Sequence, residues 1–179
     1  MLKKILIVLA VLILAFVIVV ATRPADYRVT RSAAFAASPE ILFTQINDFH
    51  KWDAWSPWSK LDPNAKITFS GAEAGEGASF SWAGNNQIGE GRMTITESRT
   101  NELIRLKMEF FKPVAGVSTT EFSFKPEGDQ TMVTWSMFGK NNFMAKAVTL
   151  FMDCDNLIGS QFEKGLANLR TVVETNAVK

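Results

Sequence analysis

The hydrophobic pattern divides the chain into two unlike parts. Residues 5–21 read ILIVLAVLILAFVIVVA, a run without a charge, a proline or a glycine. As a helix this run extends about 26 Å, and its flanking residues bring the length close to the roughly 30 Å hydrocarbon core of a bilayer. The pattern predicts a transmembrane anchor within residues 1–22, followed by a short linker at 23–26.

A cleaved secretory signal peptide is the alternative interpretation of this run. Val19 and Ala21 are acceptable residues before a cleavage site. However, the apolar core of a signal peptide usually has about 7–15 residues, and this run is longer and contains no helix breaker near its end. The length therefore favours a retained signal anchor.

Positive charges flank the apolar run on both sides. Lys3 and Lys4 precede it, whereas Arg23, Arg28 and Arg31 follow it. A very short N-terminal tail with positive charge is readily kept in the cytoplasm. We therefore favour a single-pass membrane protein whose domain lies outside the cytoplasm rather than inside it.

From residue 27 the pattern becomes that of a water-soluble domain. A strand is predicted over residues 27–36, and Ser38-Pro39-Glu40 is typical of a helix start. Apolar residues continue at helical spacing as far as Phe49. The helical segment is expected to end before Pro57, because proline disfavours helical geometry in the residue before it.

Alternation of apolar and polar residues predicts six further strands. They lie at residues 66–70, 78–82, 91–98, 102–110, 118–126 and 130–138. Between them, Gly84-Asn85-Asn86 and Glu127-Gly128-Asp129 are typical turn sequences. Half-buried alternation of this kind indicates an antiparallel sheet with one covered face.

The last predicted element is a long helix over residues 142–174. A straight helix of that length would extend about 50 Å, so we expect a bend near residues 153–155 or at Gly159. A single apolar stripe recurs every three or four positions, at Ala147, Leu150, Cys154, Ile158, Phe162, Leu166, Leu169 and Val173.

The order of elements predicts an α+β fold. A curved antiparallel sheet of about seven strands, in the order β-α-β6-α, would wrap around the long C-terminal helix. This domain is expected over residues 27–175, with a tail at 176–179.

Four sequence motifs resemble those of one superfamily with this architecture. They are WDAWSPW at 52–58, GEGRMTITES at 89–98, MVTWSM at 132–137 and FEKGLANL at 162–169. Together with their order over about residues 27–174, they resemble the helix-grip superfamily of START-like and polyketide cyclase/dehydrase-like proteins (SRPBCC), in a branch with an N-terminal membrane segment. The resemblance implies a cavity between the sheet and the long helix. The superfamily includes lipid carriers, binders of hydrophobic ligands, cyclases and regulatory co-factors.

The tryptophan-rich segment has two interpretations. By analogy with the superfamily, Trp52, Trp55 and Trp58 would border the entrance or end wall of the cavity. Alternatively, the three rings close the end of the sheet as part of the core, since clustered aromatic residues usually reflect burial.

Composition narrows the classes of function. The chain has 19 Lys and Arg against 18 Asp and Glu, and only Lys3 and Lys4 of these precede residue 22. A nearly neutral domain provides no electrostatic argument for binding nucleic acid. One histidine and one cysteine do not form a usual zinc site. We therefore predict no nucleic acid, metal or cofactor, and the sequence indicates no oligomeric state.

Groups suited to acid–base catalysis are also few. His50 is expected at an exposed helix end, and Cys154 lies on the apolar stripe of the long helix. Glu90 and Arg92 are the best candidates, but their strand position places them opposite Met93 and hence toward solvent. No catalytic residue is predicted, and the absence of catalysis is the preferred interpretation.

These arguments predict a membrane-anchored protein that binds an apolar small molecule or lipid without catalysis. One alternative is a polyketide cyclase/dehydrase-like enzyme, and a second is a membrane-displayed interaction module with an exposed tryptophan surface. The predicted ligand-binding residues combine inward strand positions with the helix stripe, so they are equally the expected core: Trp55, Trp58, Phe80, Trp82, Met93, Ile95, Leu106, Met108, Phe122, Phe124, Trp135 and Phe162.

Overall fold

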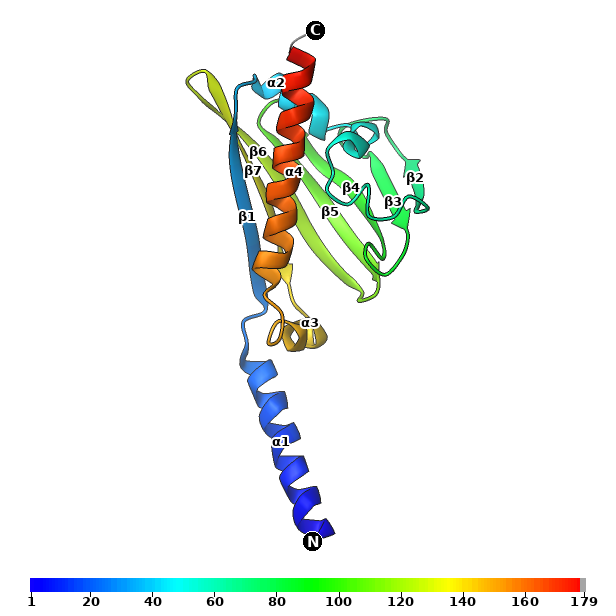
Figure 1. Cartoon of the computed structure of the whole chain (residues 1–179), viewed down its shortest axis with the longest axis vertical. Coiled ribbons are helices and arrows are strands. Elements are labelled where there is room, and N and C mark those ends of the chain that lie inside the picture. Colours follow the sequence, from blue (N-terminus) through cyan, green and yellow to red (C-terminus); the bar gives the residue numbers. More distant parts are fainter. Residues whose placement is uncertain (178–179) are drawn as a thin grey trace.

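The structure, a computed structural model, describes residues 1–177; residues 178 and 179 of the tail expected at 176–179 lie outside the described residues. Figure 1 shows an apolar helix, α1 (Leu2–Thr22), that extends away from a curved sheet. A second long helix, α4 (Cys154–Ala177), lies along the inner face of that sheet. This is the α+β helix-grip arrangement that the sequence predicts.

The sheet has seven strands in the order β1-β7-β6-β5-β4-β3-β2, and every neighbouring pair is antiparallel. The first strand therefore pairs with the last one, and the other strands follow as consecutive hairpins. All seven predicted strands form, with ends that differ by a few residues from the predicted ones. Their bounds are β1 Asp26–Phe35, β2 Lys66–Ser70, β3 Ser79–Ala83, β4 Glu90–Arg99, β5 Leu103–Lys112, β6 Gly116–Glu127 and β7 Gln130–Lys140.

The segment between β1 and β2 forms two short helices. The helix predicted at Ser38 is α2 (Pro39–Ile46). A 3-10 helix, η1 (Phe49–Ala54), follows it and begins where the Asp48 side chain accepts a hydrogen bond from the His50 backbone N–H. Helical structure thus ends before Pro57, as predicted. The apolar residues of these two short helices belong to the core beneath α4.

The prediction of a single bent helix over residues 142–174 is wrong, because the chain forms two separate helices there. The first is α3 (Phe143–Val148), and the second is α4. Asp153 ends the connecting loop, and its carboxylate accepts hydrogen bonds from the backbone and side-chain nitrogens of Asn156. This local capping allows the backbone to start a new helix. Ala147 and Leu150, assigned to the apolar stripe, consequently lie outside the buried core.

Helix α4 is held on the sheet by one apolar stripe and one cation. Phe162 and Leu169 face the sheet and are 2% and 0% exposed. On β1, the Arg31 guanidinium bonds to the carboxylates of Asp155 (3.0 Å) and Glu163 (2.7 Å). The hydrogen bonds to Asp155 and then Glu163 raise the pKa of Arg31, so the pairs persist at any physiological pH.

Helix α1 is the one helix in the described part of the chain that is long and apolar enough to cross a membrane. Nearly all of its side chains are exposed. It contacts α3, and Val20 near its C-terminal end is fully buried. Its length and exposed apolar surface make it a candidate membrane span.

Removal of one ring from the α4 stripe tests how the helix is packed. Phe162→Ala should lower the free energy of unfolding by about 3–5 kcal/mol, because it deletes a buried aromatic side chain. Lys164→Ala, an exposed position on the same helix, should change it by less than about 0.5 kcal/mol. Urea unfolding of the full-length protein in a fixed detergent measures both changes. The reverse order would mean that α4 packs through a different face.

Candidate ligand-binding site

The strand register collects the predicted lining residues on one face of the sheet. Phe80 lies opposite Met93, and Met93 lies opposite Met108 on the next strand. Farther along the sheet, Phe122 lies opposite Trp135. Since side chains at facing positions point to the same side of a sheet, these residues share the inner face that α4 covers. The predicted parity is therefore confirmed, whereas binding by these residues remains a prediction.

The centre of the inner face is closed by aromatic stacking. The rings of Trp135 and Phe162 are nearly parallel, 9° apart, with centroids separated by 4.1 Å. Phe122 and Trp55 also pack against Trp135, with ring centroids 4.7 and 5.8 Å from that of Trp135. Eight of the twelve predicted lining residues are buried in this core: Trp55, Met93, Ile95, Leu106, Phe122, Phe124, Trp135 and Phe162.

The tryptophan-rich segment belongs mainly to the core. Trp52 is 5% and Trp55 is 1% exposed. Their indole N–H groups donate to the backbone carbonyls of Ile46 (2.8 Å) and Gln45 (3.3 Å). The two rings thus close one end of the sheet and present no tryptophan surface for a protein partner.

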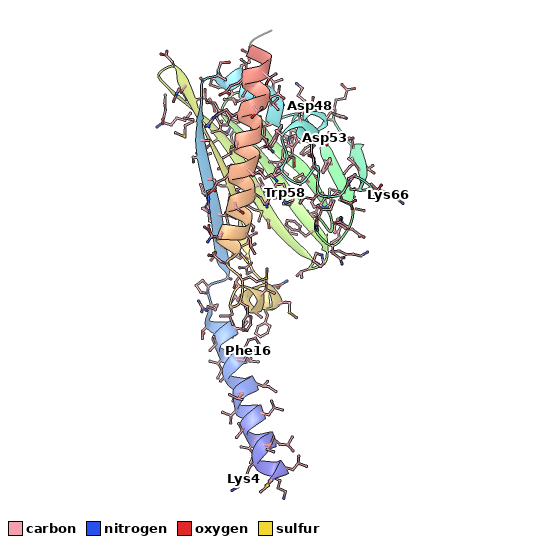
Figure 2. All side chains as sticks on the ribbon, viewed as in Figure 1. Lys4, Phe16, Asp48, Asp53, Trp58 and Lys66 are labelled. Carbon is pink, nitrogen blue, oxygen red and sulfur yellow. The ribbon has the colours of Figure 1, made fainter. Side chains whose placement is uncertain are left out.

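Trp58 differs from the other two tryptophans because it is only partly buried. The edge of its ring packs toward Trp135 (5.9 Å) and Phe162 (6.4 Å), and Figure 2 shows the residue beside α4. Trp58 therefore stands at the border between the closed core and the rest of the inner face.

The remaining apolar part of the inner face is partly exposed, and we call it the open half. It consists of Trp58, Phe80, Trp82, Met108 and Phe110. It continues on β2 in the more exposed Phe69, whose ring centroid lies 5.6 Å from that of Phe80. Trp82 connects it, with ring centroids 6.1 Å from Phe80 and 6.2 Å from Phe110. Phe110 has the same inward parity on β5 as Met108 but is not among the residues predicted to line the site.

Glycine at position 91 allows the Trp82 ring to lie flat on the sheet. Trp82 and Gly91 are paired across β3 and β4. A Cβ atom on Gly91 would overlap the indole ring and would lie 2.6 Å from the Glu109 carbonyl oxygen. The indole N–H donates to the Ile88 carbonyl at 2.9 Å, so the ring is held in place with one apolar surface available.

Three buried polar atoms near this border have no hydrogen-bond partner among the described residues. They are Thr120 Oγ1, Trp135 Nε1 and Gln161 Oε1. Thr120 lies two residues from Phe122 on the inner face, and Gln161 lies one helical turn before Gly165, which packs against Trp135. Each unpaired buried group costs about 1–3 kcal/mol. Together they comprise an indole donor, an amide acceptor and a hydroxyl.

Tyr27 supplies another polar group at the inner face, at the end of the sheet nearest α1. Its hydroxyl is 2.5 Å from Ser118 Oγ. Burial raises the pKa of the Tyr27 phenol, so the phenol remains neutral. Tyr27 is not among the residues predicted from the sequence, although its parity with the buried Val29 on β1 would have indicated it.

The candidate acid–base residues lie on the opposite face. Glu90 forms an ion pair with Lys112 (2.7 Å), and Arg92 Nε donates to Ser81 Oγ (3.2 Å). Their predicted solvent-facing position is confirmed. His50 is half exposed and bonds to Asp48 (3.0 Å). Within residues 1–177, no group of three His, Cys, Asp or Glu side chains converges on a possible metal position.

Two open hollows lie at the end of the domain nearest α1. One, of about 520 Å³, is lined by residues 149–155. The other, of about 450 Å³, lies between the start of β1 and the end of β7. Neither hollow is the cavity between the sheet and the long helix that the superfamily resemblance implies, and that cavity remains a prediction.

Comparison with known families and structures identifies relatives of the whole domain. A family model described as "Polyketide cyclase / dehydrase and lipid transport" matches residues 26–174. No curated protein matches the chain.

Solved structures with the same fold have low sequence identity. A Staphylococcus aureus protein of unknown function, SA2116, superposes with a TM-score of 0.64 at 14% identity, over 88% of this chain and 99% of that one. The Aha1 dimer from Colwellia psychrerythraea superposes with a TM-score of 0.58 at 14% identity, over 80% of this chain and 93% of that one. A Nitrosospira multiformis protein superposes with a TM-score of 0.57 at 22% identity, over 81% of this chain and 94% of that one. These similarities establish the fold.

Two glycines of α4 form a matched pair that tests the contact with Trp135. A Cβ on Gly165 would lie 2.7 Å from the Trp135 ring and 3.1 Å from Pro57, whereas a Cβ on Gly159 would meet only the flexible end of Arg31. Alanine stabilises a helix by about 1 kcal/mol relative to glycine, but overpacking costs about 1–3 kcal/mol.

Gly165→Ala should therefore lower the melting temperature and shift the tryptophan emission. Gly159→Ala should leave the emission unchanged, because its Cβ would displace the Arg31 guanidinium from its ion pairs and would not meet an aromatic ring. Differential scanning fluorimetry and emission spectra of the two variants measure these effects. A stabilised Gly165→Ala protein would show that α4 does not approach Trp135 closely.

Proposed function

Because the chain belongs to the polyketide cyclase/dehydrase and lipid transport family, we propose that it is a membrane-anchored binding protein for an apolar small molecule or lipid. In this proposal residues 1–22 are the anchor, residues 23–26 are the linker and residues 27–175 are the binding domain. The ligand lies on the inner face of the sheet, between the open half and α4.

The observation that carries this proposal is the contrast between the two parts of the inner face. The core around Trp135 is closed, whereas the open half leaves aromatic surface at Trp58 and Trp82 accessible. Unpaired polar atoms of Thr120 and Gln161 lie near the border. Apolar walls with a few polar groups are typical of small-molecule sites.

The charges near this face favour a neutral ligand over an anionic one. Arg31 is the cation among the inward positions of β1, and its guanidinium is already bound by two carboxylates of α4. The polar groups that remain are a hydroxyl, an amide oxygen and an indole N–H. They suit an alcohol, ketone or quinone oxygen, whereas a carboxylate would be buried without a counter-charge at a cost in free energy.

The two alternative functions have less support. Cyclase chemistry requires an acid or base at the bound ligand, but Glu90 and Arg92 lie on the opposite face of the sheet. An interaction module of the expected kind requires an exposed tryptophan surface, but Trp52 and Trp55 are buried. Ligand binding uses the residues that remain accessible.

Ligand titration of the full-length protein in lipid nanodiscs tests the proposal. A long-chain alcohol or isoprenoid alcohol should quench or shift tryptophan emission saturably with micromolar affinity, about −8 kcal/mol. The carboxylic acid of matched chain length should bind more weakly, because the site offers no free cation. Ligand at 100 times its dissociation constant should add about 2.7 kcal/mol of stability.

Two tryptophan variants locate the binding surface. Trp82→Phe should weaken binding by roughly fivefold, about 1 kcal/mol, because the open half loses aromatic surface. Trp52→Phe should lower the melting temperature but leave affinity unchanged, because Trp52 lies within the core. Equal effects on affinity, or no saturable signal with any member of a diverse ligand panel, would contradict the proposed function.

Membrane fractionation tests the anchor separately. Full-length protein should remain in the pellet after alkaline carbonate washing, because residues 5–21 are predicted to be embedded in hydrocarbon. Mass spectrometry of the protein from cells should find the N-terminal residues still present. A mature N-terminus near Thr22 would instead identify the run as a cleaved signal peptide.

A further inference from the structure

Apolar side chains are concentrated at the end of the domain that adjoins α1. Helix α3 buries none of its residues, and Phe151 and Met152 follow it in the loop before α4. Phe151 is 79% exposed and Met144 is 60% exposed. Positions 143, 144, 147 and 148 share one side of α3, and Phe151 and Met152 lie in the turn that follows it. We call these apolar residues together the α3 surface.

The α3 surface touches the apolar helix directly. The ring of Phe151 stacks on that of Phe16 with centroids 6.4 Å apart. Lys146 Nζ donates to the Ala21 carbonyl oxygen at 3.4 Å, and Val20 is completely buried. Figure 1 shows α3 beside the domain end of α1, and Figure 2 labels Phe16 on the side of α1 that faces this region.

The position of Phe16 along α1 sets the depth of Phe151. Phe16 lies five residues before Ala21, the last residue of the apolar run, which corresponds to about 7.5 Å along the helix axis. A transmembrane helix places such a position inside the hydrocarbon region. The Phe151 ring stacked on it must then lie at nearly the same depth.

We propose that α3 and residues 149–152 form a second membrane contact, with α3 lying in the interface and the Phe151 ring in the acyl region. This inference rests on the proposed anchoring of α1 and adds an occupant for the α3 surface, namely the lipid of the same leaflet. Exposed phenylalanine and methionine beside a basic residue are typical of an interfacial segment.

Basic residues at the same level fit the phosphate groups of the lipids. Arg23, Arg28, Lys140 and Lys146 belong to this end of the domain, and none of them forms an ion pair with another described residue. The Arg28 guanidinium lies 4.0 Å from the centroid of the Phe138 ring, beside the 450 Å³ hollow. Asp26 is the acidic residue in the lining of that hollow. Such a collar would lie at the headgroups while Phe151 lies below them.

The second contact would determine how the domain sits on the bilayer. With α1 alone, the three residues between α1 and β1, 23–25, would let the domain rotate freely above the membrane. With α3 embedded, the end of the sheet that carries Tyr27 is held against the lipid surface. A membrane-soluble ligand would then reach the domain without crossing bulk water.

Depth-dependent quenching in the full-length protein tests this inference. In a Cys154→Ser background, an environment-sensitive fluorophore is attached at Phe151→Cys, Leu12→Cys or Thr171→Cys in separate proteins. The proteins are reconstituted into phosphatidylcholine/phosphatidylglycerol vesicles that contain lipids with a doxyl quencher near the headgroup or deep in the acyl chain. Thr171, exposed near the far end of α4, is the aqueous control.

The probe at 151 should be quenched several-fold more strongly than the probe at 171, and more by the shallow quencher than by the deep one. The probe at 12 should respond most to the deep quencher. Met144→Cys, also exposed on the α3 surface, should repeat the pattern of 151 if the Phe151 variant folds poorly.

Quenching at 12 without quenching at 151 and 144 would overturn the inference and leave the anchor intact. Absence of quenching at 12 as well would contradict the anchor itself. A probe at 151 that is shielded from water, insensitive to both quenchers and dependent on protein density would show that a second copy covers the α3 surface, and this result would also overturn the inference.

Discussion

The stacking of Phe162 on Trp135 is the contact on which the arrangement of the domain depends. It joins α4 to β7, the strand that pairs with both β1 and β6. The contact therefore connects the last helix of the domain to the sheet that contains its first strand. Gly165 permits this close approach. Two ion pairs from Arg31 add an outer attachment along β1. With the helix held in this way, one side of the inner face is closed and the other is left accessible.

The division of the inner face would allow one fold to combine a stable core with the proposed binding surface. Trp52 and Trp55 complete the core and satisfy their indole N–H groups with backbone carbonyls. Trp58 and Trp82 keep accessible ring surface, while nearby polar atoms lack partners. Burial of apolar ligand surface against these rings would favour binding, and a hydrogen bond to one of the buried polar groups would favour it further. This combination agrees with a family described in part by lipid transport.

Most of the fold was predictable because strand alternation reports both strand position and orientation. The parity of Met93, Phe122 and Trp135 placed them on one face, and the register confirms that placement. Parity does not show whether an inward residue is packed or accessible, so the core and the proposed ligand contacts could not be separated. That separation depends on where α4 crosses the sheet.

Two other features depended on local details that periodicity does not reveal. The division of the last helical region follows from Asp153 bonding to Asn156, although the apolar spacing continues through the break. The contact between Phe16 and Phe151 joins residues that are far apart in the sequence. Apolar exposure at α3 became recognisable only when the two segments were placed beside each other.

The central claim is that the open half of the inner face holds an apolar molecule in the membrane-bound protein. Native mass spectrometry of full-length protein, released from nanodiscs made with its native membrane lipids, tests this most directly. One neutral apolar molecule per chain should persist on the wild type, and a Trp58→Ala/Trp82→Ala variant that remains folded should lose it while retaining lipids bound around α1. A wild-type protein that carries only the lipids also found on the variant would contradict the claim.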